Sequence, residues 1–129
     1  MKVFLSYASE DRNVASVIAD ALRDEGHDVY PSANWPKDLG AALKRAEAFV
    51  VLLSPAAVGS PYVGEEIKLA LVAERLEERV IPVVLSPSTK VPWILQTMRP
   101  IAFKSNARTA AELIHRRLQA HRAADSGAR

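Results

Sequence analysis

The run Phe49-Val50-Val51-Leu52-Leu53, in the middle of the chain, contains no polar side chain. A continuous apolar run of this length is expected of a strand in a parallel sheet, because helices cover such a sheet on both faces. Similar short apolar runs alternate along the chain with segments of helical periodicity, and this alternation favours an α/β topology. We therefore predict an open parallel sheet with helices on both of its faces.

The order of the expected elements predicts a five-stranded sheet of flavodoxin-like type. Strands are predicted at residues 3–7, 28–30, 49–53, 80–85 and 101–103. Helices are predicted at residues 10–25, 38–47, 61–78 and 107–122. Residues 31–37, 54–59 and 87–100 are predicted to be irregular. In this fold class the strand order is 2-1-3-4-5.

Length and composition fit one domain. The 129 residues are 49% hydrophobic and 25% charged, which is ordinary for a globular domain. A chain of this size buries enough surface to stabilise a single core. We assign residues 1–122 to the domain and residues 123–129 to a flexible C-terminal tail. The absence of cysteine excludes disulfides and thiolate metal sites.

We expect a cytoplasmic protein without a membrane or nucleic-acid partner. The segment Lys2-Val3-Phe4-Leu5 lacks the long apolar core of a signal peptide. No apolar run approaches the roughly 20 residues that cross a bilayer. The formal net charge of +2 is too small to indicate nucleic-acid binding.

The predicted strand order also locates a ligand site. In an open α/β sheet, ligands bind beyond the carboxyl ends of the strands, at the switch point in strand order. Here that point lies between the first and third strands. The residues leaving these strands are Ser6-Tyr7-Ala8-Ser9 and Ser54-Pro55, so we expect the site among them.

Familiar catalytic motifs are missing from the chain. It has no GxGxxG turn and no Walker loop, which excludes the usual dinucleotide and triphosphate cradles. The histidines, His27, His115 and His121, do not have metal-ligand spacing. We assign them structural or solvent-exposed roles and predict no metal site.

The acidic pair Glu65-Glu66 lies on the helix predicted from Pro61. Helical periodicity buries one stripe of this helix, made of Val63, Ile67, Ala70 and Leu71. Glu65 falls nearly opposite this stripe, whereas Glu66 falls at its edge with Tyr62 one turn earlier on the same side. We therefore expect Glu66 to lean into the crevice beside an aromatic ring.

A carboxylate in such a crevice suits the cleavage of an N-ribosyl bond. This reaction passes through an oxocarbenium-like state, as glycoside hydrolysis does, and a nearby anion stabilises the developing positive charge. A cationic pyridinium leaving group needs no general acid, so one carboxylate suffices. From spacing alone, the alternative is that Glu66 is an ordinary surface glutamate.

Two segments resemble the Toll/interleukin-1 receptor (TIR) domain family, in particular its bacterial members. Phe4-Leu5-Ser6-Tyr7-Ala8-Ser9-Glu10-Asp11 resembles the first box of the family. Leu53-Ser54-Pro55 and Ser60-Pro61-Tyr62-Val63-Gly64-Glu65-Glu66 resemble its stretch from the third strand into the following helix. The family pattern there has a tryptophan, with a glutamate four positions later. Tyr62 takes the tryptophan position and Glu66 the glutamate position.

The resemblance implies roles for several residues. In enzymatic TIR domains this glutamate is the catalytic residue for NAD+ cleavage, so Glu66 is the predicted catalytic residue. Ser54 and Tyr62 are predicted to bind substrate. Ser6 and Tyr7 are predicted either to line the path of the ribose and phosphate or to form a strand end that caps a helix. Trp35 either stacks on a base of the substrate or anchors its loop. The loop at 31–37 is shorter than is usual in the family, and Ser32 stands where the family often has an aspartate.

These observations leave competing functions. The first is an NAD+ glycohydrolase or cyclase that releases nicotinamide with ADP-ribose or a cyclic isomer, as in bacterial antiphage signalling, with NAD+ as substrate and no cofactor. The second is a non-catalytic scaffold for homotypic TIR assembly. A weaker third is a nucleoside deoxyribosyltransferase-like enzyme, which the first box disfavours. The resemblance also implies self-association with other TIR domains and a fused or separate sensor protein as partner.

Overall fold

The structure is a computed structural model that describes residues 1–32, 39–73, 76, 79–104 and 106–127; the side chains of residues 39–41 and 123–127 are outside the description. Its strands are β1 (Lys2–Ser6), β2 (Asp28–Pro31), β3 (Ala48–Leu53), β4 (Val80–Val84) and β5 (Ile101–Ala102). They form one parallel sheet in the order β2-β1-β3-β4-β5. The predicted fold class and strand order are confirmed.

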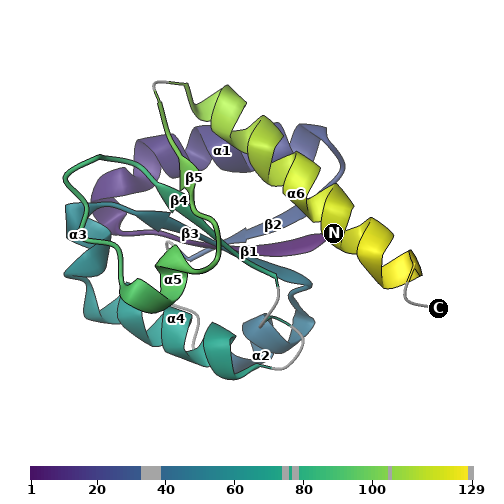
Figure 1. Ribbon diagram of the computed structural model, residues 1–129, viewed down its shortest axis with the longest axis horizontal. Helices are drawn as coiled ribbons and strands as arrows, with labels where there is room; N and C mark the ends of the chain where they lie inside the picture. The colour runs from purple at the N-terminus through teal and green to yellow at the C-terminus, as the bar shows by residue number, and fades with distance from the viewer. Residues whose placement is uncertain (33–38, 74–75, 77–78, 105, 128–129) are drawn as a thin grey trace.

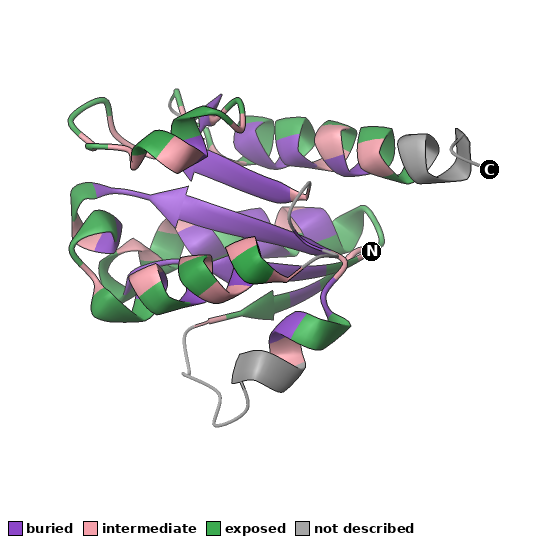
Figure 2. Cartoon of the chain, turned by 60° about the horizontal axis from the view of Figure 1, so that its bottom comes forward, coloured by how far each residue is buried: buried purple, intermediate pink, exposed green. Residues whose placement is uncertain are grey.

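Helices cover both faces of this sheet. They are the 3₁₀ helix η1 (Ser9–Asp11) and the α-helices α1 (Arg12–Asp24), α2 (Leu39–Arg45), α3 (Pro55–Val58), α4 (Pro61–Val72), α5 (Trp93–Gln96) and α6 (Ala107–Gly127). Helices α1 and α6 lie on one face, whereas α2, α4 and α5 lie on the other (Figure 1). In Figure 2 the central strands are buried between the helical layers, whereas the edge strand β2 and the outward helix surfaces are largely exposed.

The central strand β3 supplies both cores, because its side chains alternate between the two faces of the sheet. Ala48, Val50 and Leu52 pack with α1 and α6. Phe49, Val51 and Leu53 pack with α2, α4 and α5. All six residues are completely buried, as predicted for a strand covered on both sides.

Helix α1 shows the largest departure from the predicted burial pattern. In the sequence, Val14, Val17, Ile18 and Leu22 recur at the i, i+3, i+4 spacing of one helix face, but Val17 is 45% exposed. The buried residues are Ala15, Ile18, Ala19 and Leu22. Small alanine side chains let the helix approach the sheet and α6 closely, so the packed face is rotated toward them.

Some element boundaries differ from the predictions as well. The segments 54–59 and 87–100, predicted as irregular, contain the one-turn helices α3 and α5. Helix α4 ends at Val72 rather than near Glu78, and α6 continues to Gly127 rather than ending at Arg122. The division into residues 1–122 and a tail stays a prediction. Gly26 has φ = 91°, as expected of a glycine that ends a helix.

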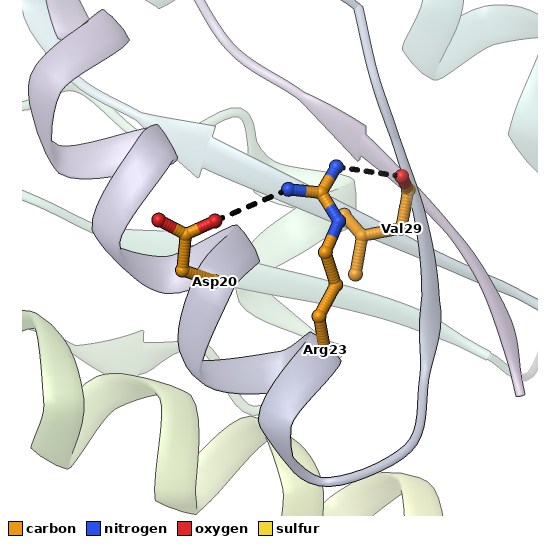
Figure 3. Close-up of polar contacts among 3 residues, drawn as sticks. All are labelled: Asp20, Arg23 and Val29. Atoms are coloured by element: carbon orange, nitrogen blue, oxygen red, sulfur yellow. Dashed lines mark hydrogen bonds and ion pairs between the residues drawn. The ribbon is translucent and has the colours of Figure 1, made fainter.

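Arg23 joins the end of α1 to the edge strand β2. One guanidinium nitrogen contacts Asp20 Oδ1 at 3.3 Å, and the other donates to the carbonyl oxygen of Val29 at 3.1 Å (Figure 3). Because a strand at the edge of a sheet presents unpaired backbone groups, this side chain satisfies one of them.

Two of the histidines connect the turn after α1 to α6. His27 Nε2 and His115 Nδ1 lie 2.8 Å apart, and His115 Nε2 lies 3.4 Å from Glu25 Oε2. Burial, followed by the nearby N-terminal amino group, lowers the pKa of His27.

Within the described ranges, no cluster of three or more metal-ligating side chains is found, and no helix has the length and apolar character that crossing a membrane requires.

Candidate active site

A cleft of about 450 Å³ opens at the carboxyl ends of β1 and β3, the place predicted from the strand order. Its walls come from the segment after β1, the end of β2 and the α3–α4 region. The lining residues are Tyr7, Ala8, Ser9, Glu10, Arg12, Ser32, Ala56, Gly59, Ser60, Pro61, Tyr62 and Glu66. A cleft of this volume accommodates a small organic ligand.

Glu66 projects into this cleft from α4. Ser60 fixes the start of the helix, since its hydroxyl accepts a hydrogen bond from the Val63 N–H, and Pro61 follows at the first helical position. Glu66 is only 1% exposed, whereas Glu65 is exposed. The predicted contrast between the two glutamates is confirmed, but Glu66 is buried more deeply than a residue at the edge of the stripe.

The two carboxylate oxygens of Glu66 have different surroundings. Oε1 accepts a hydrogen bond of 2.7 Å from the hydroxyl of Ser6, at the end of β1. Oε2 is buried and makes no hydrogen bond with any residue that the structure describes. An unpaired buried oxygen is unfavourable for a folded protein, so Oε2 has an unused capacity to accept a hydrogen bond.

Burial raises the pKa of the Glu66 carboxyl from 4.5 to about 7. Removal from water disfavours the charged form. The hydroxyls of Ser6 and, to a smaller extent, Ser32 act in the opposite direction. The carboxyl therefore exchanges its proton near neutral pH, as many functional carboxyl groups do.

Comparison with known proteins identifies the family. A model of the TIR domain matches residues 3–120, which include both segments that resemble the family and all of the sheet except Lys2. The chain belongs to the TIR domain family. No curated protein matches it.

Solved structures share the fold of this TIR domain at low sequence identity. The TIR domain of the Toll-related receptor TRR-2 from Hydra magnipapillata is 18% identical, has a TM-score of 0.72, and the match covers 92% of this chain and 95% of that one. A flavodoxin-like domain from Synechococcus sp. is 16% identical, with a TM-score of 0.59 and coverage of 87% and 92%. A diflavin flavoprotein A3 from Nostoc sp. is 16% identical, with a TM-score of 0.55 and coverage of 94% and 97%.

Tyr7 and Tyr62, both predicted to bind substrate, line the cleft of the TIR domain. Tyr7 is largely buried, and its backbone N–H donates to the Ser32 hydroxyl at 3.2 Å. Tyr62 is 64% exposed, on the first turn of α4. Their roles toward a substrate stay predictions, but their positions suit a wall and a rim of the cleft.

Two other predicted binding residues, Ser6 and Ser54, do not line the cleft. Ser6 is completely buried behind Glu66 and is not part of the cleft lining. Ser54 is also absent from that lining, because its hydroxyl accepts from Ala57 N–H at the start of α3 and donates to Asp11 Oδ2 at 2.5 Å. The contacts of Ser6 with Glu66 and of Ser54 with Ala57 and Asp11 lie within the chain, and the roles of both serines toward a substrate stay predictions. Trp35 lies outside the described residues.

Ser32 and Arg12 also line the cleft, although neither was among the predicted site residues. Ser32 directly follows β2, and Leu5 of β1 pairs with Pro31 of β2, so the pairing register places Ser32 close to Ser6. Arg12 is the first residue of α1. The signal that was available is the rule that side chains following adjacent parallel strands meet at one edge of the sheet.

Removal of the Ser6 hydroxyl is expected to raise the pKa of Glu66 further. In Ser6→Ala, Oε1 loses its hydrogen bond, which favours the ionised carboxylate. We expect an increase of roughly one pKa unit, since a hydrogen bond to a charged group contributes about 1.5–3 kcal/mol. The measurement is a pH titration of the Glu66 side-chain carbon by NMR. Ser54→Ala is the control, and an unchanged or lower pKa in Ser6→Ala would contradict this effect of the Ser6 hydroxyl.

Proposed function

We propose that this TIR domain cleaves the bond between nicotinamide and ribose in NAD+, with Glu66 as the catalytic residue. The observation that supports this most directly is the arrangement of the Glu66 carboxylate. One oxygen is held by Ser6, while the other is buried, unpaired among the described residues and part of the cleft lining. A group oriented in this way is prepared to contact a ligand that enters the cleft.

The chemistry of the bond matches a single carboxylate. As the C–N bond breaks, positive charge develops on the ribose, and the ionised Glu66 stabilises that charge and accepts hydrogen bonds from ribose hydroxyls. Nicotinamide leaves as a neutral pyridine, so the leaving group needs no proton. Attack by water then gives ADP-ribose, whereas attack by a group of the same molecule gives a cyclic isomer. Tyr62, at the position of the family tryptophan, offers a ring on which the nicotinamide stacks.

The wider context is also proposed from the family. Self-association with other TIR domains, a cytoplasmic location, a sensor module as partner and a role in bacterial antiphage signalling are consistent with enzymatic TIR domains. NAD+ is then the substrate, with no cofactor, and neither nucleic acid nor membrane is a partner.

The test is an assay of nicotinamide release. The purified protein at high concentration is incubated with NAD+, and products are separated by chromatography. Glu66→Ala is expected to abolish release, whereas Glu65→Ala, which alters the neighbouring exposed residue, is expected to retain it. Loss of release in both variants, or no release by the wild type even in assembled form, would count against the catalytic proposal.

An assembly scaffold is the second candidate, and it is favoured by exposed apolar side chains on α4 and α5. Tyr62, Val72 and Trp93 are 64%, 78% and 75% exposed. Large exposed apolar side chains of this kind are available for contact with another protein. If the protein assembles but never releases nicotinamide, and Glu66→Ala assembles normally, the scaffold function is the correct one.

A further inference from the structure

Among the residues that the structure describes, Arg12 is the cationic side chain in the lining of the cleft. It is exposed and makes no ion pair or side-chain hydrogen bond with the described residues. Other arginines contact groups within the chain. Arg23 contacts Asp20 and Val29, and Arg117 donates to the carbonyl of Arg99. The guanidinium of Arg12 is therefore available to a ligand.

The position of Arg12 extends the site beyond the cleft. A shallow hollow of about 390 Å³ adjoins the cleft and is lined by Ser9, Glu10, Arg12 and Asn13. Because Arg12 borders both spaces, a ligand that reaches from Glu66 toward this hollow passes its guanidinium. The site thus has an acidic group in its depth and a basic group at its rim.

We propose that Arg12 binds the phosphate groups of the substrate and restricts it to phosphorylated nicotinamide nucleosides. A ligand that matches both ends of the site has ribose hydroxyls or a cationic ring near Glu66 and an anionic group near Arg12. Guanidinium binds phosphate oxygens through paired, charge-assisted hydrogen bonds. The choice of nicotinamide as the leaving group rests on the proposed function, but phosphate binding by Arg12 is tested separately from catalysis.

Glu10 supplies an internal comparison, because it lines the same two spaces with the opposite charge. Its carboxylate accepts a hydrogen bond of 2.9 Å from the Ser9 hydroxyl. A phosphate beside Arg12 also experiences the negative charge of this carboxylate. Glu10→Gln is therefore expected to tighten phosphate binding, whereas Arg12→Ala weakens it.

The experiment measures the dissociation constant of ADP-ribose by calorimetry. Arg12→Ala is expected to weaken binding roughly 10- to 100-fold, the effect of losing charge-assisted hydrogen bonds, and Arg12→Lys is expected to restore part of it. Arg116→Ala, which removes an exposed arginine of α6 outside the cleft lining, is the matched control. Adenosine, which has no phosphate, is expected to bind wild type and Arg12→Ala equally.

The outcomes separate this inference from the proposed function. Equal binding of ADP-ribose by wild type and Arg12→Ala, or no binding by the wild type, overturns the phosphate assignment even if NAD+ is cleaved. The phosphate assignment is also overturned if Arg12→Ala and Glu10→Gln weaken the binding of ADP-ribose equally. Equal weakening would mean that the shape of the cleft, and not the charge of these side chains, determines affinity. Binding that depends on Arg12 without any nicotinamide release supports the phosphate assignment and rejects the proposed catalysis. If release occurs, Arg12→Ala raises KM for NAD+ but not for nicotinamide riboside.

Discussion

Replacement of Glu66 by glutamine is expected to stabilise the fold at pH 8 by about 3 kcal/mol. The pKa of this carboxyl is about 7 in the folded protein, against a reference value of 4.5. A carboxyl with a raised pKa binds its proton more tightly in the folded state, so the stability it contributes is full below pH 4.5. That contribution is lost as the pH rises through about 7. The difference between a pKa of 4.5 and one of about 7 corresponds to about 3 kcal/mol, since one pKa unit is worth about 1.36 kcal/mol.

Urea denaturation at pH 4.5 and pH 8 measures this effect. At pH 4.5 the protonated carboxyl and the glutamine amide are both neutral, so wild type and Glu66→Gln are expected to be similar in stability. At pH 8 only the wild type carries the buried charge, and the variant is expected to be more stable. Glu65→Gln, at an exposed position, is the control and is expected to show no such pH dependence. A variant that is less stable than wild type at pH 8 would contradict the buried ionised carboxylate.

The same substitution is expected to reduce nicotinamide release at least roughly 100-fold. The amide occupies the same space but carries no negative charge, so it does not stabilise the oxocarbenium-like state. Loss of one preorganised electrostatic partner commonly reduces rates by roughly 10²- to 10³-fold. A side chain whose charge weakens the fold while it supports a reaction belongs to a functional site, because strain is retained where function needs it.

The pH dependence of the wild-type reaction follows from the same ionisation. The ionised form of Glu66 is the active one in the proposed mechanism, so release is expected to rise as the pH passes through about 7. The initial rate at saturating NAD+, measured from pH 5.5 to roughly pH 8.5, gives this profile. A rate that falls as Glu66 ionises would show that the carboxyl acts as an acid instead.

Most of the sheet could be predicted from the sequence because its strands are short apolar runs separated by helical segments. The run Phe49 to Leu53 defines the buried centre, and the parallel order follows from the alternation of elements. The inner face of α1 was less predictable. Periodicity selects the largest apolar residues, yet Ala15 and Ala19 are buried while Val17 is 45% exposed. Which face packs depends on how closely α6 and the sheet approach, and this information lies outside the helix itself.

The position of the site could be predicted from the sequence, but the extent to which Glu66 is buried could not. Helical periodicity placed Glu66 at the edge of a buried stripe, and its burial to 1% exposure depends on a partner, Ser6, that is 60 positions away in sequence. A periodicity argument within one helix contains no information about that partner. Ser54 shows another limit of the sequence, because its place after β3 does not reveal that its hydroxyl accepts a hydrogen bond from the Ala57 N–H at the start of α3.

Of the substitutions discussed, Phe49→Ala is expected to lower the free energy of unfolding the most. The ring is completely buried on β3 and lies parallel to the ring of Phe4 on β1, with centroids 5.7 Å apart and an angle of 12° between the planes. It belongs to the same core as Val63 and Ala70 of α4, the helix that carries Glu66. Phe49→Ala removes the ring contacts and leaves a cavity, at a cost of about 3–5 kcal/mol.

That loss is comparable with the whole stability of many domains, about 5–15 kcal/mol. We therefore expect the urea midpoint of Phe49→Ala to fall sharply, with part of the protein unfolded in buffer. Val72→Ala, on the 78% exposed position of α4, is the matched control and is expected to change stability by less than about 0.5 kcal/mol. Phe49→Leu retains most of the apolar volume, so its urea midpoint is expected to lie between those of Phe49→Ala and Val72→Ala. Because α4 rests on this core, molecules of Phe49→Ala that stay folded are also expected to lose the fixed position of Glu66 and release nicotinamide more slowly. A stable Phe49→Ala with an unchanged rate would mean that α4 is held by contacts other than those of the Phe4–Phe49 core.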